Sequence, residues 1–458
     1  MINKTDSAPL QKNEEVLIHI DDLGSNGEVI GHYNGFAVFV NGALPQETVL
    51  AHIIKVTTHY AVAIISKIIN ASADRIEPVC TSWPKCGGCH FQHLSYEAEL
   101  EYKRAKIESC LKRIGCMENV SVPNVKFSPN WQHYRNKAQF PIRTDGSNLK
   151  YGFFALRSHR IIDLPMDGCL LQNETANSLI HEIASEMKRI KESIYNEETH
   201  SGLIKHVLIR TLETISVTFV VSVAFFNNLE HWKQFFEKKQ IDFSVNLQPK
   251  DDNVIMGPEM IYSSSDKSVG DIGNLRFYIA PQSFFQVNSF MTYELYQTAL
   301  DFADLKETDD VLDLFCGVGT ISLFMAQKAH RVYGIEYVKE AIENARQNAA
   351  LNNITNTKFF AGPCEEITEN VLKTETFNPS VIILDPPRSG CEEALIRFLS
   401  GLNAPRIVYV SCDPATLARD LKIFKEQGNY QVIKVQGVDM FPRTIHVETV
   451  VLMSRDKE

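Results

Sequence analysis

The sequence predicts an α/β and β protein of about three domains: a small β-barrel, a mixed α+β region and a mostly parallel sheet with crossover helices. Three observations predict this order. Short strands with turn residues fill 14–70, a cysteine-rich stretch interrupts the chain at 71–110, and strand and helix patterns alternate from residue 305. The 458 residues fit domains of roughly 150 residues each. We expect domains at 12–70, 71–290 and 291–458.

The barrel is predicted from five apolar or alternating runs at 15–23, 27–31, 35–40, 47–56 and 60–69. Gly, Asn and Pro separate these runs, and five short strands with such turns fit a small closed barrel. A generic β-subdomain with the same strands is the alternative.

A cysteine-dense loop follows the barrel and contains Cys80, Cys86 and Cys89, with Cys169 farther along the chain. Four thiolates suit zinc or an iron–sulfur cluster. From the residues alone, zinc is the simpler choice. A helix is predicted after this loop over 96–115, where apolar and aromatic residues recur near helical spacing.

The central region mixes strands and helices, and its longest predicted strand is Ile215–Ala224. Within it, the segment 126–160 carries seven basic residues against the single acid Asp145, although the whole chain has a net charge of −10. Its basic residues are Lys126, Arg135, Lys137, Arg143, Lys150, Arg157 and Arg160, and seven aromatic residues lie among them. Cations can hold phosphates and aromatic rings can stack bases, although a solvated face beside a core gives similar counts. Arg135 and Lys137 are the basic residues we single out.

The C-terminal region alternates strands and helices, as in a parallel sheet. Strands are predicted at 311–315, 332–336, 381–385, 406–410, 430–436 and 446–453, and a helix at 337–353. The first strand runs through a glycine turn into a helix, which brings backbone N–H groups close to a ligand. The turn reads GVG followed by TIS, not G-x-G-x-x-G, which weakens a dinucleotide interpretation. Glu336 ends the next strand and can accept hydrogen bonds from both ribose hydroxyls. Together these features resemble class I methyltransferases that bind S-adenosylmethionine.

Three further residues are candidates for the chemistry of this region. Asp385 ends a predicted strand and is followed by two prolines and an arginine, whereas amino-methylating enzymes have an aromatic residue there. Cys412 follows the next strand at the predicted start of a helix, where the helix dipole should lower its pKa. Glu448 lies in an apolar strand and suggests a base. A buried apolar cysteine and a solvent-facing glutamate are the alternatives.

Composition and charge exclude several classes of protein. The chain is 44% apolar and 22% charged, which excludes a disordered or collagen-like chain. The longest nearly apolar stretch, Ile215–Phe226, is shorter than the roughly 18 residues that span a bilayer, and the first fifteen residues lack a secretory signal. Because a protein that coats DNA by charge is basic, we expect no DNA partner. The short apolar stretch and the missing secretory signal lead us to expect no membrane partner and a cytoplasmic location.

Five motifs in order resemble those of the bacterial RNA uracil-5-methyltransferases. They are QSFFQVN at 282–288, DLFCGVGT at 313–320, DPPR at 385–388, SCDPATLARD at 411–420 and FPRTIHVET at 441–449. The resemblance covers about 440 residues, including a barrel similar to the family's OB-like TRAM domain. It is nearest to the branch that methylates large-subunit ribosomal RNA, and within it to the dual-site enzymes of Gram-positive bacteria. It implies a class I methyltransferase fold with a mostly parallel seven-stranded sheet, and a central α+β domain for RNA and an iron–sulfur cluster.

The resemblance also implies a reaction and its residues. Cys412 would add to C6 of a uridine in 23S ribosomal RNA, unassembled or partly assembled, and Glu448 would remove the C5 proton. Gln286, Phe315, Glu336 and Asp385 would contact S-adenosylmethionine. Cys80, Cys86, Cys89 and Cys169 would hold a [4Fe–4S] cluster, with zinc as the alternative, in a monomeric enzyme. The same reaction on transfer RNA, N-methylation and a catalytically silent RNA-binding protein are the competing functions. Two positions depart from the family pattern, which often has Asn at Asp413 and His at Arg443.

Overall fold

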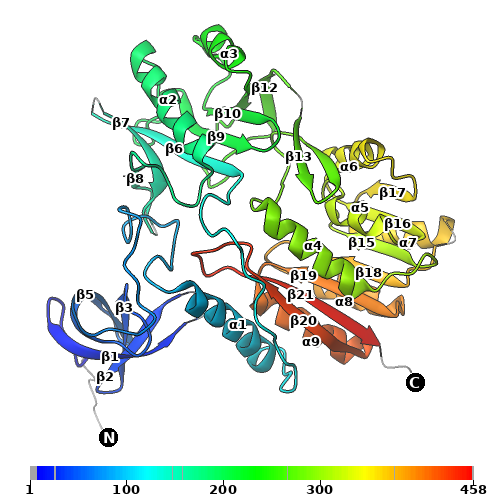
Figure 1. The fold of residues 1–458 in the computed structure, drawn as a ribbon, viewed down its shortest axis with the longest axis horizontal. Coiled ribbons are helices and arrows are strands. Elements are labelled where there is room, and N and C mark those ends of the chain that lie inside the picture. Colours follow the sequence, from blue (N-terminus) through cyan, green and yellow to red (C-terminus); the bar gives the residue numbers. More distant parts are fainter. Residues whose placement is uncertain are drawn as a thin grey trace, which may run out of the picture. The chain divides into compact units, whose positions relative to one another are not determined.

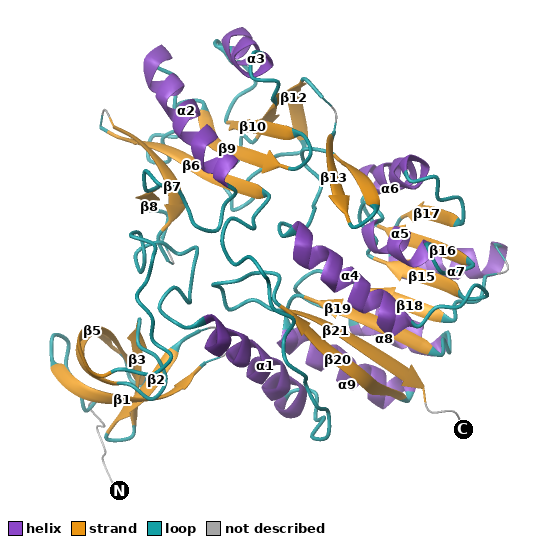
Figure 2. Ribbon diagram, viewed as in Figure 1, coloured by secondary structure: helices purple, strands orange, loops and turns teal. Residues whose placement is uncertain are grey.

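The computed structural model describes residues 8–24, 27–146, 148–156, 158–265, 267–375 and 377–455, which form two compact units. The first unit reaches Tyr102 and also takes in Arg443–Ile445. The second contains Lys103–Pro442 and the residues from His446 onward. Figure 1 gives the order of the elements along the chain, and Figure 2 separates helices from strands. Among the described residues, no helix has the length and apolar character needed to cross a membrane.

The first unit contains the predicted β-barrel. Its strands are β1 (Glu15–Leu23), β2 (Val29–Tyr33), β3 (Phe36–Asn41), β4 (Thr48–Val56) and β5 (Tyr60–Asn70), and they close in the order β1-β2-β3-β5-β4. Alternate residues of each strand point inward, so that apolar side chains such as Ile18, Val38 and Ile53 fill the interior. The alternation that predicted the strands is therefore the alternation that packs the barrel.

The segment Arg443–Ile445 is built into this unit through buried polar contacts. The Arg443 backbone N–H donates to Glu99 Oε1 at 2.7 Å. The Arg443 guanidinium donates to the carbonyl oxygens of Leu94 at 2.8 Å and Phe91 at 3.3 Å. Glu99 belongs to α1 (Tyr96–Arg113), which has acidic residues in its first turn and basic residues in its last, as the helix dipole favours. The arginine at position 443 thus has a structural role.

The second unit begins with a mixed sheet in the order β12-β11-β10-β9-β6-β7-β8. Its strands are β6 (Lys137–Asp145), β7 (Asn148–Phe154), β8 (Ile161–Asp163), β9 (Ile204–Thr211), β10 (Ile215–Val221), β11 (Asp242–Leu247) and β12 (Glu259–Ser263). Helix α2 (Glu174–Ile190) packs on β9 and β7, and α3 (Leu229–Glu237) packs on β11. The strand predicted to reach Ala224 ends at Val221, and the next residue, Ser222, donates its backbone N–H to the Leu203 carbonyl oxygen and its hydroxyl to that of Gly202.

The C-terminal sheet has the order β17-β16-β15-β18-β19-β21-β20. Its strands are β15 (Asp310–Leu314), β16 (Arg331–Glu336), β17 (Thr357–Ala361), β18 (Val381–Leu384), β19 (Arg406–Ser411), β20 (Tyr430–Val438) and β21 (Glu448–Arg455). All pairs among β15–β19 are parallel, whereas β21 runs antiparallel to both of its neighbours. The parallel sheet with crossover helices is confirmed, and β17 is the strand that our sequence interpretation did not name.

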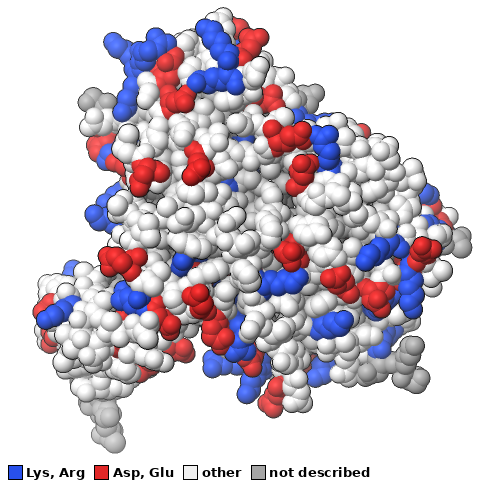
Figure 3. All heavy atoms as spheres, in the orientation of Figure 1, with Lys and Arg blue, Asp and Glu red and all other residues white. Residues whose placement is uncertain are grey.

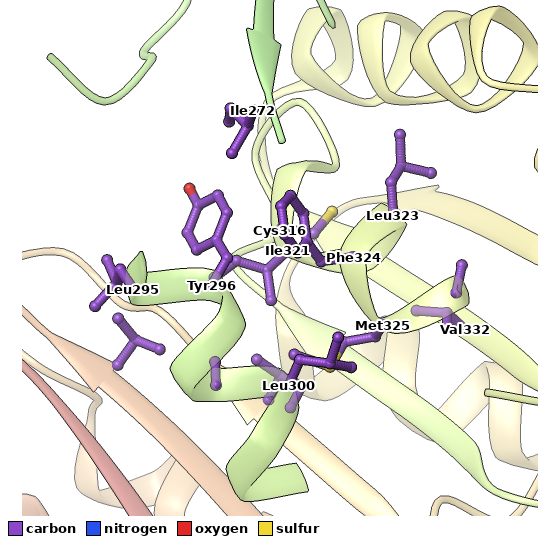
Figure 4. Packing of buried hydrophobic residues seen from close by; sticks show 14 of the residues in the cluster. Ile272, Leu295, Tyr296, Leu300, Cys316, Ile321, Leu323, Phe324, Met325 and Val332 are labelled. Atoms are coloured by element: carbon purple, nitrogen blue, oxygen red, sulfur yellow. The ribbon is translucent and has the colours of Figure 1, made fainter. Parts of the chain in front are cut away.

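Helices cover both faces of this sheet, and a two-stranded ribbon precedes it. The ribbon is β13 (Ser268–Ile272) with β14 (Leu275–Ile279), and the helices are α4 (Ser289–Ala303), α5 (Thr320–Ala326), α6 (Lys339–Leu351), α7 (Cys364–Thr374), α8 (Glu393–Gly401) and α9 (Pro414–Gly428). Figure 4 shows α4 and α5 meeting through buried side chains, where Tyr296 and Phe324 pack edge to face at 5.4 Å. The Tyr296 hydroxyl lies 3.0 Å from the Thr320 hydroxyl at the start of α5. This packing fixes the position of the glycine turn before α5.

Candidate active site

The candidate residues of the second unit gather at one edge of the C-terminal sheet. Because β16, β18 and β19 are parallel, Glu336, Asp385 and Cys412 all lie at carboxyl ends of strands, where α/β sheets bind ligands. Strand β21 runs the opposite way, and its second residue, Thr449, pairs with Ser411. Glu448, the first residue of β21, therefore reaches the same edge as Cys412.

The glycine turn between β15 and α5 is held in an unusual backbone conformation. Phe315 has a φ of 63°, which costs a side-chain-bearing residue roughly 1–3 kcal/mol. Gly317 donates its N–H to Glu336 Oε2 at 3.2 Å, and Val338 donates to Glu336 Oε1 at 3.0 Å. A Cβ on Gly319 would lie 3.1 Å from Ala345, whereas a Cβ on Gly317 would meet nothing within 4 Å. The space beside Gly319 is thus filled by neighbouring side chains, whereas the space beside Gly317 is open.

A buried carboxylate beneath this turn lacks one partner. Asp313 is fully buried and accepts a hydrogen bond from the Ser322 hydroxyl at Oδ2, while Oδ1 has no partner among the described residues. Burial raises the pKa of Asp313 to about 7, and the charges of Asp385 and Glu336 add to the rise. An open glycine turn, the carboxylate of Glu336 and an unpartnered carboxylate oxygen fit a nucleoside cofactor that brings N–H and O–H donors.

The thiol of Cys412 has a raised pKa, so the predicted lowering by the helix dipole is wrong. Burial, together with the negative charges of Glu448 and Asp385, raises the pKa of Cys412 to about 11. The first free N–H groups of α9 do not reach the sulfur, because Asp413 Oδ1 accepts from Ala415 at 2.9 Å and from Thr416 at 3.1 Å. The cap residue rather than the cysteine receives the positive end of the helix.

Two carboxylates lie in the electrostatic neighbourhood of this thiol. Glu448 is 3% exposed, and burial together with the charge of Asp385 raises its pKa to about 8. Burial also raises the pKa of Asp385 to about 7. The structure therefore brings Cys412, Glu448 and Asp385 together, and places near the thiol a carboxylate whose pKa suits proton transfer near neutral pH.

Arg388 is a site residue to which our sequence interpretation gave no role. Its charge and its side-chain hydrogen bond to Cys412 both lower the pKa of the thiol, against the larger effect of burial. Its Nη2 atom also lies 3.0 Å from Nδ1 and 3.3 Å from Nε2 of His446. The available signal was the cation directly after the two prolines that follow Asp385.

Gln286 lies on the loop that leads into α4 and is 8% exposed. Its carbonyl oxygen accepts from Asn136 Nδ2 at 3.0 Å, and Asn288 Nδ2 donates to the carbonyl oxygen of Met440 at 3.1 Å. The loop is therefore fixed both to the start of β6 and to the segment that follows β20. Phe284 on the same loop is 75% exposed.

The four cysteines of the predicted cluster are distributed over both units. Cys80, Cys86 and Cys89 belong to the first unit and Cys169 to the second. Cys86 Sγ accepts from the Gly88 N–H at 3.4 Å, and Cys89 Sγ accepts from Gln92 Nε2 at 3.4 Å. Such N–H···S contacts and an all-thiol donor set fit cluster ligands. Within the described residues, however, no three His, Cys, Asp or Glu side chains are arranged to hold a metal ion.

Three of the seven basic residues of the segment 126–160 are neutralised by ion pairs within the protein. Lys126 pairs with Glu294 at 3.1 Å, Lys150 with Asp145 at 2.7 Å, and Arg143 with Glu197. Of its aromatic residues, Phe140 is buried and packs against Phe153 at 5.3 Å. Arg157 lies outside the described residues. Arg135 and Lys137 are not part of any of these ion pairs.

Sequence profiles of two known families match the chain. The profile described as tRNA (Uracil-5-)-methyltransferase matches residues 95–456, and the TRAM domain profile matches residues 9–65. The second match coincides with the barrel of the first unit, and the first covers the whole C-terminal sheet.

Similar proteins extend over nearly the entire chain. An uncharacterized RNA methyltransferase of Clostridium tetani is 42% identical over 453 residues, 97% of each chain. One of Clostridium acetobutylicum is 41% identical over 456 residues, 98% of each. The crystal structure of Pyrococcus abyssi tRNA (uracil-54, C5)-methyltransferase in complex with S-adenosyl-L-homocysteine has a TM-score of 0.75 and 26% identity, covering 95% of this chain and 98% of that one. It shares the barrel and the mostly parallel sheet.

Proposed function

The chain belongs to the RNA uracil-5-methyltransferase family, and from this premise we propose that it methylates C5 of specific uridines in 23S ribosomal RNA. It is an S-adenosylmethionine-dependent RNA methyltransferase that acts on uracil C5 and combines a TRAM domain with a class I methyltransferase fold. The observation that carries the proposed mechanism is the convergence of Cys412, Glu448 and Asp385 at one sheet edge. The finer choice of substrate rests on the motifs quoted above.

Cys412 is the proposed nucleophile, because C5 of uracil is too weakly nucleophilic to take a methyl group directly. The thiolate forms a bond to C6, and the C5–C6 π electrons move to give an enolate. C5 would then attack the sulfonium methyl of S-adenosylmethionine, and the methyl–sulfur bond would break, leaving S-adenosylhomocysteine. The Arg388 cation favours the thiolate over the thiol, which offsets part of the effect of burial.

Glu448 is the proposed base for the second half of the reaction. After methylation, C5 carries both the methyl group and its original proton. Glu448 takes that proton, the C5–C6 double bond forms again, and the bond from Cys412 to C6 breaks to release the thiolate. With its pKa raised to about 8, the ionised form of Glu448 binds this proton more strongly than an exposed glutamate does, and the fraction in that form grows as the pH rises toward 8.

Gln286, Phe315, Glu336 and Asp385 are the proposed S-adenosylmethionine contacts. Glu336 offers carboxylate oxygens to the ribose hydroxyls, and the strained backbone at Phe315 opens the glycine turn toward the ligand. Gln286 lies on a loop held by Asn136, and Asp385 follows β18 at the same sheet edge as Glu336. The target base must leave its stack, because C6 attack requires access to the face of the ring.

Ribosomal RNA is preferred as substrate because the four-cysteine pattern and the five motifs resemble the ribosomal branch of the family. We propose that Cys80, Cys86, Cys89 and Cys169 bind a [4Fe–4S] cluster, with zinc as the alternative, and that the cluster positions RNA. The Pyrococcus abyssi relative is a tRNA (uracil-54, C5)-methyltransferase, which makes transfer RNA the second candidate.

We further propose domains at 12–70, 71–290 and 291–458 and a monomeric cytoplasmic enzyme.

Methyl transfer from labelled S-adenosylmethionine tests the substrate. Protein-free 23S ribosomal RNA and total transfer RNA are offered separately, and the digested nucleosides are identified by mass. We expect 5-methyluridine from the ribosomal RNA. The same nucleoside from transfer RNA alone would keep the mechanism and overturn the substrate. Transfer to neither RNA by a protein that binds S-adenosylmethionine would contradict the proposal.

Substrate carrying 5-fluorouridine tests the covalent mechanism. Fluorine cannot leave C5 as a proton does, so the adduct at Cys412 should persist under denaturing conditions. Cys412→Ala should abolish both the adduct and methylation, whereas N-methylation would survive this substitution. Active wild-type enzyme that forms no slow-migrating complex would count against the mechanism.

A further inference from the structure

Three cations lie together at the start of β6 and the end of β9. Lys137 and Arg210 are directly opposite each other in the antiparallel β6–β9 pairing, so their side chains share one face of the sheet. Arg135 lies two residues before Lys137, and its positive charge acts on the same lysine. Like charges placed directly opposite each other destabilise a sheet.

These cations are largely removed from water without a compensating anion. Arg210 is 5% exposed, and burial lowers its pKa to about 10. Burial and the charges of Arg210 and Arg135 lower the pKa of Lys137 to about 8. Among the residues that the structure describes, Arg210 Nη1 and Arg135 Nε have no hydrogen-bond partner, and no carboxylate forms an ion pair with any of the three. A buried charge normally requires such a partner.

The cationic cluster is attached to the loop that carries Gln286. Arg210 Nη2 donates to the carbonyl oxygen of Ser283 at 3.1 Å. Asn136, between Arg135 and Lys137, donates to the Gln286 carbonyl oxygen at 3.0 Å and to the Ser289 hydroxyl at 3.0 Å. Its backbone N–H also donates to the Val287 carbonyl oxygen at 2.8 Å. The unpaired cations therefore border the candidate active site.

We propose that Arg135, Lys137 and Arg210 bind a backbone phosphate of the substrate RNA beside the target uridine. The proposal rests on the proposed function and assigns the residues that hold the RNA backbone at this site. A phosphodiester supplies the missing anion, and its oxygens accept from several N–H donors at once. Lys137, which is only half-buried, supplies a mobile ammonium to the phosphate, and the guanidinium of Arg210, whose Nη1 is buried and unpaired, places a second positive charge beside it.

The local character of this cluster fits an acidic protein. On the face shown in Figure 3, basic and acidic residues are interspersed, and no extended basic area is visible. RNA held by a general positive field would need such an area. Unpaired cations beside the reaction site instead fix the register of one nucleotide, because phosphate contacts position a nucleic acid without reading its sequence.

Lys137→Gln tests the proposal, with Lys150→Gln as its matched control. Lys150 lies in the same segment, is partly exposed and is already paired with Asp145. RNA binding to the full-length, cofactor-bound enzyme is measured from 50 to 200 mM salt. We expect Lys137→Gln to weaken RNA binding about tenfold and to reduce the slope of log affinity against log salt by about 0.7–0.9. Lys137→Arg should restore the wild-type slope.

Two control measurements complete the test. Lys137→Gln should leave the affinity for S-adenosylmethionine unchanged, and its melting temperature should equal or exceed that of the wild type, because a like-charge contact is removed. Lys150→Gln should change RNA affinity less than twofold.

Unchanged RNA affinity and salt slope in Lys137→Gln would overturn the phosphate site. Lost S-adenosylmethionine affinity with normal RNA affinity would assign the cluster to the cofactor carboxylate and also overturn it. If wild-type protein binds RNA but methylates none, the proposed function fails while the salt slopes still decide this inference. If wild-type protein binds no RNA, both fail.

Discussion

At Cys412 and Glu448, the same burial has opposite consequences for the chemistry. Burial disfavours the thiolate that must attack, and it strengthens the carboxylate as the base that must accept a proton. Arg388 acts on both groups in the direction of the charged form. Before substrate arrives, burial therefore favours the neutral forms of Cys412 and Glu448, and the Arg388 guanidinium favours their ionised forms.

The influence of the neighbours on the thiol can be measured by substitution. Since the Glu448 charge raises the pKa of Cys412, Glu448→Gln should lower that pKa, and Arg388→Gln should raise it. We expect alkylation of Cys412 by iodoacetamide at pH 9 to be faster in Glu448→Gln than in wild type and slower in Arg388→Gln, because the thiolate fraction rises as the pKa of the thiol falls. Peptide mass spectrometry gives the rate at Cys412. Equal rates in both variants would contradict the electrostatic coupling.

Glu448 should also make stability depend on pH. The folded protein keeps its proton up to about pH 8, whereas an ordinary glutamate releases it near 4.5. The free energy of unfolding therefore falls as pH rises from 4.5 to 8. Glu448→Gln should remove this loss and be more stable than wild type by on the order of 2 kcal/mol at pH 8.5, with little difference at pH 4. Thermal melts at both pH values check this.

The matched control for this stability test is Glu307→Gln, at an exposed position of the turn between α4 and β15. It should leave the melting temperature unchanged at both pH values. A Glu448→Gln protein whose stability advantage does not grow with pH would show that Glu448 ionises normally in the folded state.

The sequence allowed the candidate residues to be named but not their protonation. Asp385 and Glu336 could be placed from strand ends alone, because parallel strands bring their carboxyl ends to one edge. The pKa of Cys412 could not be predicted from the sequence, because it depends on burial by distant elements and on a cap residue that occupies the helix N–H groups. Arg210 was missed because only the register of β6 against β9 places it opposite Lys137.

At the scale of elements, the N-terminus of α9 is capped by Asp413, the residue directly after Cys412. Asp413 accepts two backbone N–H groups there. Asp413→Ala should destabilise the protein by about 1 kcal/mol, the usual effect of losing such a cap. Asp413→Asn keeps an accepting oxygen and should stay within about 0.5 kcal/mol of wild type. Denaturant unfolding of both variants measures this, and equal losses would mean that the carboxylate charge matters more than the cap.

Element prediction succeeded where side-chain periodicity was strong. The barrel strands and β15, β16, β18 and β19 are runs of alternating or continuous apolar residues, so pattern alone identifies them. Strand β17 was missed because its run, Thr357–Ala361, is short, begins with the polar pair Thr-Lys and has only three apolar residues. The apolar run continues past the end of β10, so its pattern alone could not place that end at Val221.

At the scale of the whole molecule, the proposed cluster takes its ligands from two separate stretches of the chain. Cys89→Ser should bleach the brown colour of the purified protein, reduce its iron and sulfide content, and lower methylation of RNA by about tenfold or more if a cluster positions the substrate. Cys116→Ser, at an exposed cysteine outside the predicted ligand set, is the control and should retain both colour and activity.

The outcome that contradicts this role is a folded, colourless Cys89→Ser protein with full activity on RNA. Metal analysis separates the alternatives, because zinc without iron or sulfide would replace the cluster by a zinc site.

The order of barrel, mixed region and parallel sheet was predictable from composition along the chain. The assignment of Arg443–Ile445 to the first unit was not, because it depends on buried contacts between Arg443 and residues near α1.

The position of β21 between β19 and β20 has a consequence for the time course of folding. Ser411 of β19 pairs with Thr449 of β21, and Val311 of β15 pairs with Val381 of β18, so the base and the cofactor edge both depend on contacts between distant parts of the chain, which form slowly. During refolding we therefore expect S-adenosylmethionine binding and the influence of Glu448 on Cys412 alkylation to return together. No state should accumulate that holds the methyl donor without the base.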